Sequence, residues 1–373
     1  MLSNRDRRGS EARICKAKGR QVAAALACAS LFLGGLITVA GPEASSASAA
    51  GTQTNVKLVL GWTVSPEWAG YYAAEALGYY QKAGLNVSIQ AGGPDVNTET
   101  LVGAGQGQFG ADAMNNVFAS NDTGTNLVDV AQISSRPGLR LISLKSKHLN
   151  NPNSWKGKTI GVFASDNSLY ATFAKYHIDP NSQVNIVQQG SNMNQFTSGQ
   201  LDLASGYIFD EVGQIVASGI PMSKLNLYSY TQDGTSTLED ALFENGAYMQ
   251  QNPAVSAKFV AASLKGWVYC RNNPNACVNM VDKAGAGGSK KFNQWSMNEF
   301  NQLLWPAPAQ GLGYLNPAAL RQTATILYST KVITKFPNMS AVTGTSVYNA
   351  ALKQLNGVDI NGASFKPETG LTP

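Results

Sequence analysis

The chain has 373 residues and a formal net charge of +5, which would suit an acidic partner. Most of that excess lies in residues 1–49, where seven Lys and Arg outnumber three Asp and Glu. The rest of the chain is therefore close to neutral, and no basic stripe remains to indicate nucleic-acid binding. Residues 50–373 are also too many for one ordinary hydrophobic core, so we expect two lobes.

Residues 1–49 have the order of a secretory signal peptide. A basic segment ends at Arg20, an uncharged apolar run covers residues 22–40, and Ala47-Ser48-Ala49 has the small-x-small form of a cleavage site. We expect cleavage after Ala49. The mature protein would then be exported to the periplasm or the cell exterior, either free or attached to the cell envelope. The alternative is an uncleaved membrane anchor, because the apolar run is long enough to span a bilayer. Cys28 lies too far inside that run for a lipidation site.

Strands and helices alternate after the signal segment, as in an α/β layered fold with mostly parallel strands. The expected strands are residues 56–60, 85–89, 109–111, 127–133, 139–144, 159–163, 184–187, 201–207 and 225–230. The expected helices are residues 68–83, 98–102, 115–121, 167–175, 193–198, 210–218, 253–269, 297–304 and 317–328. After residue 230 the pattern is mainly helical.

The strand and helix pattern restarts near Trp155, so one α/β unit is inserted within another. We expect a discontinuous lobe I of residues 50–143 and 231–373, and a lobe II of residues 144–230. Strands 139–144 and 225–230 would form the connections between them. Hinged α/β lobes place a ligand cleft at the carboxyl ends of their strands.

Cys270 and Cys277 are the only cysteines after residue 49. In an exported protein, two cysteines separated by a short polar loop predict a structural disulfide, here pinning a helix end. A CxxC redox pair would have a different spacing.

The sequence has few patterns that are typical of a catalytic site. Residues 105–110 match the dinucleotide pattern GxGxxG, but they follow a helix and precede a strand, so we interpret them as a turn. The chain has only two histidines, His148 and His177, and neither belongs to a metal-binding motif. We therefore assign no catalytic residue, no cofactor and no metal, and we favour binding over catalysis.

Aromatic residues gather where strands end and helices begin. Trp62 follows the first strand, Trp68 and Tyr71 open the next helix, and Tyr207 ends a later strand before Glu211. Aromatic walls with a few polar groups suit a planar heterocycle. Core packing is the alternative for the tryptophans, and a solvated first-turn carboxylate is the alternative for Glu211.

Several segments together resemble the thiamine-pyrimidine-synthase-like (SsuA/Thi-like) family of ABC transporter substrate-binding proteins. They are residues 60–74 (LGWTVSPEWAGYYAA), 78–87 (GYYQKAGLNV), 155–162 (WKGKTIGV), 199–202 (GQLD) with Gly206, Tyr207 and Glu211, 265–267 (KGW) and 313–315 (GYL). The resemblance covers most of residues 55–335. It implies the type II periplasmic-binding fold, with ligands such as thiamine pyrimidine precursors, riboflavin or small sulfonates.

The resemblance also implies roles for particular residues. Trp62 corresponds to a cofactor-stacking tryptophan of the synthase branch, while Trp68 stands where those enzymes carry a functional histidine. Their cysteine-rich motif is absent, which disfavours catalysis. Their phosphate-cradling turn aligns with residues 164–168, where Ser165 and Ser168 offer hydroxyls but Asp166 would repel an anion. We therefore expect a neutral or weakly charged ligand.

We therefore expect the extracytoplasmic binding protein of an ABC importer, acting as a monomer with a small-molecule ligand and the importer's membrane subunits as partners. The expected ligand-binding residues are Trp62, Trp68, Tyr71, Asp112, Asn115, Ser165, Asp166, Ser168, Tyr207 and Glu211. The alternatives are an exported enzyme on the same fold and a membrane-anchored ligand-sensing module.

Overall fold

The computed structural model describes residues 53–163 and 166–373. The predicted signal peptide and Ser165 lie outside the described residues. Among the helices that are described, none is both long and apolar enough to cross a membrane.

The first sheet has five strands in the order β2-β1-β3-β10-β4. They are β1 (Thr54–Leu60), β2 (Leu85–Gln90), β3 (Phe109–Asp112), β4 (Leu127–Gln132) and β10 (Ala241–Asn245). β1 pairs in parallel with β2 and β3, whereas β10 runs antiparallel between β3 and β4. β10, which comes more than a hundred residues after β4 in the chain, therefore lies between β3 and β4 in the sheet.

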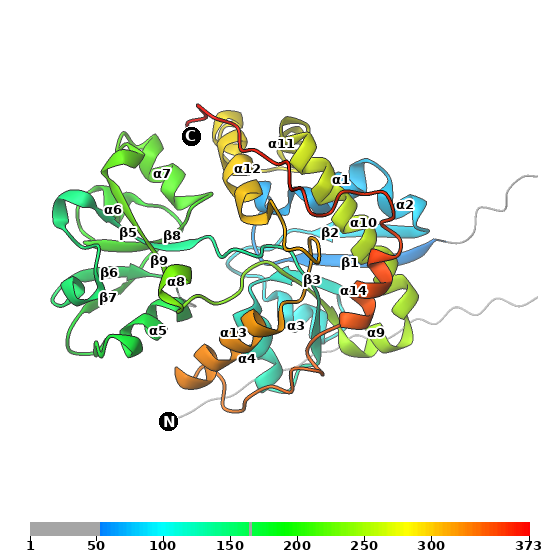
Figure 1. Cartoon of the computed structure of the whole chain (residues 1–373), viewed down its shortest axis with the longest axis horizontal. Coiled ribbons are helices and arrows are strands. Elements are labelled where there is room, and N and C mark those ends of the chain that lie inside the picture. The colour runs from blue at the N-terminus through cyan, green and yellow to red at the C-terminus, as the bar shows by residue number, and fades with distance from the viewer. Residues whose placement is uncertain (1–52, 164–165) are drawn as a thin grey trace, which may run out of the picture. The chain divides into compact units, whose positions relative to one another are not determined.

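Helices cover both faces of this sheet (Figure 1). On one side lie α1 (Ala69–Ala76), α2 (Tyr79–Lys82), α10 (Pro253–Asn272), α11 (Pro274–Lys283) and α12 (Lys290–Leu304). On the other lie α3 (Thr98–Gly103), α4 (Met114–Asp122) and α13 (Pro317–Ser329). Two further helices, α9 (Gly246–Gln251) and α14 (Thr345–Leu352), pack against α10.

The second sheet is built entirely from residues between β4 and β10. Its order is β7-β6-β8-β5-β9, with β5 (Leu139–Leu144), β6 (Thr159–Val162), β7 (Asn185–Gln188), β8 (Leu203–Tyr207) and β9 (Leu225–Ser229). Its helices are α5 (Asn167–Lys175), α6 (Asn194–Thr197), α7 (Glu211–Ala217) and α8 (Tyr230–Asp233). Short 3-10 helices are η1 (Pro66–Trp68), η2 (Lys145–Lys147), η3 (Pro152–Trp155) and η4 (Met222–Lys224). The division of the chain into two α/β lobes stays a prediction.

Three expectations need correction. β5 and β9 are not connections, because they pair with each other along their lengths inside the second sheet. The chain instead passes between the sheets at residues 133–138 and 234–240, which we call the two crossing segments. The expected helix 68–83 is divided into η1, α1 and α2, with Gly78 in the left-handed region at φ 67°. β10 was not expected at all.

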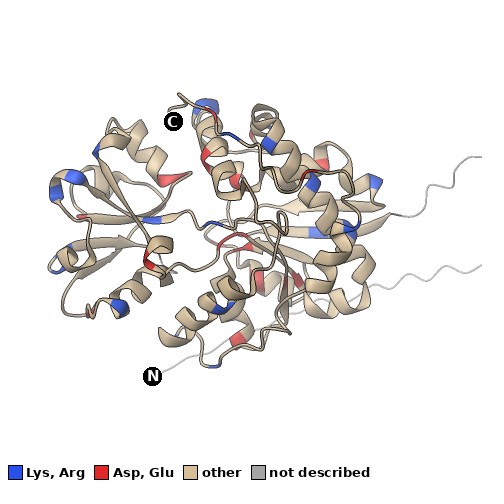
Figure 2. Ribbon diagram, viewed as in Figure 1, with Lys and Arg blue, Asp and Glu red and all other residues tan. Residues whose placement is uncertain are grey.

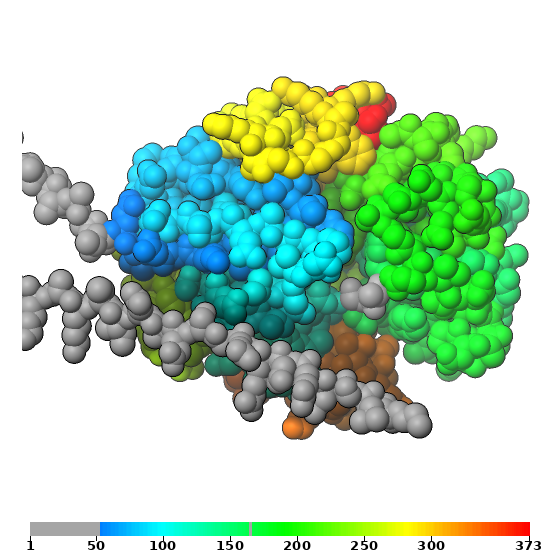
Figure 3. All heavy atoms as spheres, turned by 180° about the vertical axis from the view of Figure 1, so that it is seen from behind, coloured from blue at the N-terminus to red at the C-terminus, as the bar shows by residue number. Residues whose placement is uncertain are grey.

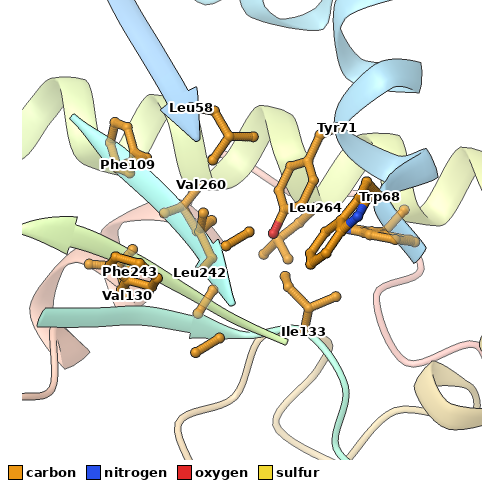
Figure 4. Close-up of a cluster of buried hydrophobic side chains, with 14 of the residues drawn as sticks. Leu58, Trp68, Tyr71, Phe109, Val130, Ile133, Leu242, Phe243, Val260 and Leu264 are labelled. Atoms are coloured by element: carbon orange, nitrogen blue, oxygen red, sulfur yellow. The ribbon is translucent and has the colours of Figure 1, made fainter. Parts of the chain in front are cut away.

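The main core lies between the first sheet and the helices α1 and α10 (Figure 4). Two glycines allow these helices to approach closely: the Trp267 ring lies against Gly70, and the Gly70 carbonyl lies against Gly266. A Cβ atom at Gly70 would stand 2.2 Å from the Trp267 ring, so any larger residue would separate the helices.

The disulfide prediction is confirmed: Cys270 and Cys277 are bonded, with their Cα atoms 5.5 Å apart. The loop expected between them is wrong, because Pro274 begins α11 almost directly after α10 ends at Asn272. The bond therefore closes a tight corner between two helices, with both sulfurs in the core.

Candidate ligand-binding cleft

A cleft of about 500 Å³ is bounded by three separate parts of the chain. Its walls are residues 62–67 after β1, residues 209–217 around α7, and residues 287–293 at the start of α12, with Pro373 at the margin. Figure 3 shows the C-terminal residues in red between the yellow helices and the green second-sheet segment. This volume is in the range of small-molecule sites.

Aromatic side chains line all three walls. Trp62 is 39% exposed, an unusual fraction for so large an apolar ring, while Phe209 is buried. Phe209 is held edge-on by Phe300 of α12, with ring centroids 5.0 Å apart. Phe292 forms the third wall beside Trp295. A flat ring entering the cleft would meet apolar surface from each side.

Two hydrogen bonds fix the backbone at Trp62 and Thr63. The Trp68 indole Nε1 donates a hydrogen bond of 3.2 Å to the Thr63 carbonyl, and the Gly92 N–H donates one of 2.9 Å to the Trp62 carbonyl. Trp68 itself is only 3% exposed and packs into the core shown in Figure 4. The structure therefore places Trp68 in a supporting position behind the cleft wall.

Tyr71 and Asn115 are likewise buried. The Tyr71 ring meets the Trp267 ring edge-on at 5.8 Å, inside the packing of α1 against α10. Asn115 lies in the first turn of α4. A helix that begins beside a cleft still buries most of its first turn, so an aromatic residue at a helix start need not face the ligand.

Carboxyl groups are the dominant polar feature of the cleft. Glu67 and Asp210 line it, and Glu67 shares a hydrogen bond with Asp240 of the second crossing segment. The pKa of Glu67 is raised well above its usual range, first by burial and then by the charges of Asp240, Asp210 and Asp112. Figure 2 shows acidic ribbon at the start of α7 and in the segment that leads into β10.

Asp112, a predicted site residue, belongs to this acidic group. It ends β3, accepts a hydrogen bond of 2.6 Å from the Ala113 N–H, and interacts with Glu99 at the start of α3. Its carboxylate fills the space above Gly61, where a Cβ atom would come within 2.6 Å of it. Burial raises the pKa of Asp112 and raises that of Glu99 to about 8.

Asp166 and Ser168 make internal contacts. The Asp166 carboxylate accepts the Leu169 N–H at 3.0 Å, which caps α5, and also accepts the Ser205 hydroxyl of β8. Ser168 Oγ accepts the Thr237 N–H at 3.2 Å, which ties α5 to the second crossing segment. Both carry out structural tasks, and their contact with a ligand stays a prediction.

Tyr207 and Glu211 support the second wall. Tyr207 lies 5.2 Å from Phe209 between ring centroids, and its backbone N–H donates to Glu211 Oε2 at 2.8 Å. Glu211 is buried, and burial raises its pKa to about 8. The alternative of a solvated Glu211 is therefore wrong; this carboxyl group holds the end of β8 in place.

Of the residues that line the cleft, only Trp62 was among the ligand-binding residues expected from the sequence. Glu67, Gln214 and Phe292 line the cleft but were not expected there, and neither was Asp240, which is hydrogen-bonded to Glu67. Glu67 had an available signal, since it lies within the aromatic segment between Trp62 and Trp68. The start of α12 had none, because only the tertiary fold brings it to this place. No group of three potential ligands for a metal ion occurs within residues 53–163 and 166–373.

Comparison with known proteins identifies the family of this chain. A family profile described as NMT1/THI5 like matches residues 65–277. The chain belongs to the NMT1/THI5-like family. The resemblance found in the sequence is thereby confirmed.

Two relatives in this group match over most of the chain. One is the riboflavin-binding protein RibY of Chloroflexus aurantiacus, 25% identical over 251 residues, which cover 65% of this chain and 70% of that protein. The other is the formylaminopyrimidine-binding protein of Halalkalibacterium halodurans, 22% identical over 250 residues, covering 66% of this chain and 75% of that one. Both are named as binding proteins for small heterocycles.

A solved structure confirms the predicted fold class. The periplasmic aliphatic sulphonate binding protein SsuA of Escherichia coli has a TM-score of 0.59 at 13% identity, covering 77% of this chain and 91% of that chain. The fold is therefore that of the periplasmic binding proteins. Enzymes also occur among the relatives: the 4-amino-5-hydroxymethyl-2-methylpyrimidine phosphate synthase of Legionella pneumophila is 27% identical over 109 residues, 29% of this chain and 34% of that enzyme.

Proposed function

We propose that this chain is the extracytoplasmic substrate-binding protein of an ABC importer, and that it captures a small planar heterocycle in the cleft. The observation that carries the proposal is the exposed Trp62 ring facing a cleft whose other walls carry Phe209 and Phe292. The names of the riboflavin-binding and formylaminopyrimidine-binding relatives support a pyrimidine or riboflavin-like ligand.

The proposal includes a hinge. The lobes would be residues 53–132 with 241–373, and residues 139–233, joined by the two crossing segments. Lobe I stays discontinuous, as expected from the sequence. Its two internal borders change from residues 143 and 231 to residues 132 and 241, because β5 belongs to the second sheet and β10 to the first. A ligand that touches both lobes would favour a closed form, which the membrane subunits would recognise in a monomeric, exported receptor.

The test is direct identification of the ligand. The secreted protein is purified without denaturation and examined by native mass spectrometry, and the mass of any retained compound is determined. Calorimetric titration then follows with riboflavin, N-formylaminomethylpyrimidine and 4-amino-5-hydroxymethyl-2-methylpyrimidine. Binding of a planar heterocycle at one site supports the proposal, whereas binding of only non-aromatic solutes contradicts it.

An exported enzyme on the same fold is the second candidate. It is favoured by the hydrogen-bonded carboxyl pair of Glu67 and Asp240, because two carboxyl groups with raised pKa values are also a pattern of acid–base chemistry. Recovery of the titrated compounds unchanged after prolonged incubation with the protein would exclude it for those compounds.

A further inference from the structure

Exposed apolar side chains gather at the end of α13, away from the cleft. Among residues 53–163 and 166–373, five large hydrophobic side chains are exposed, and three of them, Tyr328, Val332 and Phe336, belong to residues 328–336. The rings of Tyr328 and Phe336 meet edge-on, with centroids 6.2 Å apart. Single exposed hydrophobic residues are ordinary, whereas a contiguous group indicates a surface that something else covers.

The segment that follows α13 is fixed to the body of the protein. Asp122 at the end of α4 accepts hydrogen bonds from the Thr334 N–H at 2.8 Å, the Thr334 hydroxyl at 2.9 Å and the Lys335 N–H at 3.0 Å. Ile333 is 2% exposed and belongs to the main core. The apolar side chains on either side of Ile333 are therefore held at the surface by an anchored backbone.

Basic side chains surround the exposed rings. The Arg321 guanidinium lies over the Phe336 ring, 5.6 Å from its centroid. Lys331 and Lys335 are exposed in the same segment, and Figure 2 shows basic residues on α13 and on the chain that follows it. Within the described part of the chain, none of these three cations takes part in an ion pair.

Little negative charge offsets these cations. Residues 300–358 include no Asp or Glu. Asp122 does contact the segment, and the charge of Lys335 acts on it, but its oxygens are already bonded to the backbone and to Thr334. One carboxylate against three cations leaves this surface with a positive net charge, although the chain after residue 49 is close to neutral as a whole.

We call this surface the basic aromatic patch; its members are Arg321, Tyr328, Lys331, Val332, Lys335 and Phe336. We propose that it rests on the headgroup region of an anionic lipid membrane. Aromatic rings favour the boundary between headgroups and acyl chains, because they are apolar and polarisable at once. Lysine and arginine near such a boundary keep their charged ends among the anionic headgroups and are attracted to them.

The size of the patch favours a membrane over an acidic protein partner. Exposed fractions between 39% and 51% on three such side chains amount to roughly 200–300 Å² of apolar surface. A stable protein interface takes about 800 Å² from each partner. Contact with a membrane needs much less, because a few apolar side chains enter the interface while the charges around them act over the whole lipid surface.

The inference goes beyond the proposed function and does not rest on any ligand in the cleft. It gives an exported receptor a second way to stay near an importer, since a protein adsorbed to the membrane searches for its membrane subunits along a surface. The patch and the cleft share no residue. Each can therefore be tested without the other.

The test is binding of the mature protein, beginning at Ala50, to lipid vesicles. Vesicles of phosphatidylcholine alone are compared with vesicles of equal parts of phosphatidylcholine and phosphatidylglycerol, and bound protein is measured by flotation over a range of lipid concentrations. The charge variant is Lys331→Glu/Lys335→Glu. Its matched control, Lys353→Glu/Lys366→Glu, makes the same change in net charge at exposed lysines after α14 and in the C-terminal segment, which lie apart from α13 in Figure 1.

A second pair of variants tests the apolar part of the patch. Phe336→Ser removes one exposed ring, and Met222→Ser is the matched control, because Met222 is 42% exposed in η4 beside the second sheet. Thermal unfolding of each variant establishes that it is folded. Binding is measured at low and at raised salt, since salt screens the charges but not the apolar contact.

The unmodified protein should bind the anionic vesicles and bind the neutral ones far more weakly. A lysine near an anionic surface contributes about fivefold in affinity, so the charge variant should lose roughly twentyfold or more. Phe336→Ser should lose roughly threefold to thirtyfold at both salt concentrations, from the apolar area removed. Both controls should bind as the unmodified protein does.

Three outcomes would overturn the inference. Equal losses in the two lysine variants would show that binding follows net charge rather than the patch. Equal binding to neutral and anionic vesicles would remove the role of the basic residues. Absence of binding to either vesicle would exclude the membrane and leave an acidic protein surface as the occupant of the patch. Because the assay contains no ligand, each of these results leaves the proposed function standing.

Discussion

The Glu239 carboxylate accepts a hydrogen bond of 2.6 Å from the backbone N–H of Gly138, and a second of 3.1 Å from Leu139. Glu239 belongs to one crossing segment and Gly138 to the other, so a single side chain ties together the two places where the chain passes between the sheets. Ile133 and Asp240 add a backbone hydrogen bond of 3.0 Å between the same segments.

Glu239→Gln should therefore weaken the junction. An amide presents one acceptor oxygen in place of two, so one backbone N–H would be left unpaired in a buried place. We expect a loss of about 1–3 kcal/mol in the free energy of unfolding, measured by urea denaturation. Glu244→Gln is the matched control: it is an equally buried glutamate of β10 that accepts the Ser256 hydroxyl at 2.5 Å, away from the crossing segments. If only the control lowered stability, Glu239 would have no role at the junction.

Stability should decline as pH rises from weakly acidic to alkaline values. Burial raises the pKa of Asp129 and Glu244 to about 8 each, against an ordinary value near 4 in the unfolded chain. Between those values the folded state binds more protons than the unfolded state, so raising the pH favours unfolding. Each such group contributes at most about 1.4 kcal/mol per pH unit within that window.

Asp129→Asn tests this explanation, because Asp129 lies at 0% exposure in β4 and away from the cleft. The plot of unfolding free energy against pH should be flatter for this variant between about pH 5 and pH 8. Asp122→Asn is the contrasting control. Its pKa is lowered, mainly by hydrogen bonds from Thr334, so its stabilising effect is present at neutral pH and is lost only as the pH falls through the acidic range. An equal flattening in both variants would contradict the argument.

The order of elements was largely predictable, and the exceptions have physical reasons. Asn316 followed by Pro317 marks the start of α13 locally, and Asn316 does cap it. β10 offers no alternation, because its residues 241–244 are buried on both faces in the middle of a sheet. Its pairing with β3 and β4 depends on residues more than a hundred positions earlier in the chain, which no local pattern records.

The candidate site was predictable only where a wall lies at a strand end. Trp62 lies two residues after the end of β1. Because ligand clefts lie at the carboxyl ends of strands, the predicted strand alone was enough to identify Trp62 as a cleft residue. Phe292 and Asp240 reach the same region from distant segments. Tyr71 shows the converse error of a local rule, since the packing of α1 against α10 turns its ring into the core.

Reduction of the Cys270–Cys277 bond should lower stability modestly. The bond closes a short loop, so it restricts the unfolded chain by at most about 2–3 kcal/mol. The expected observation is no free thiol in the denatured, unreduced exported protein, and a lower melting temperature after reduction. The Cys270→Ala/Cys277→Ala double variant should match the reduced protein. Two free thiols would contradict the prediction.

Trp62→Ala should weaken binding of a ring ligand much more than it lowers stability. Because the ring is 39% exposed, its removal leaves little cavity in the core. Loss of one stacking face should cost about 1–3 kcal/mol of binding free energy, as in base–aromatic stacking. Phe336→Ala is the matched control, with the same 39% exposure outside the cleft. Calorimetry and thermal unfolding are compared for both; a large fall in melting temperature with unchanged affinity would favour a core role for Trp62.

The two proposed lobes would be joined by the crossing segments and would move about them, yet α12 contacts both η1 and α7, so closure has to preserve or remake that contact. A ligand that bound one wall alone would bind open and closed forms equally and shift nothing, whereas a change from mostly open to mostly closed needs several kcal/mol of difference. A ligand between Trp62 and Phe209 touches both walls and can supply it.

We therefore expect saturating ligand to reduce the radius of gyration in solution X-ray scattering. Tyr207→Ala and Glu211→Ala should weaken this compaction, because Tyr207 packs beside Phe209 and Glu211 holds the Tyr207 backbone, while the unliganded profile stays the same. Phe336→Ala should compact as the unmodified protein does. Tight binding without any change in scattering would show that the two crossing segments do not act as a hinge, and that capture and recognition by an importer rely on local rearrangement of the cleft walls.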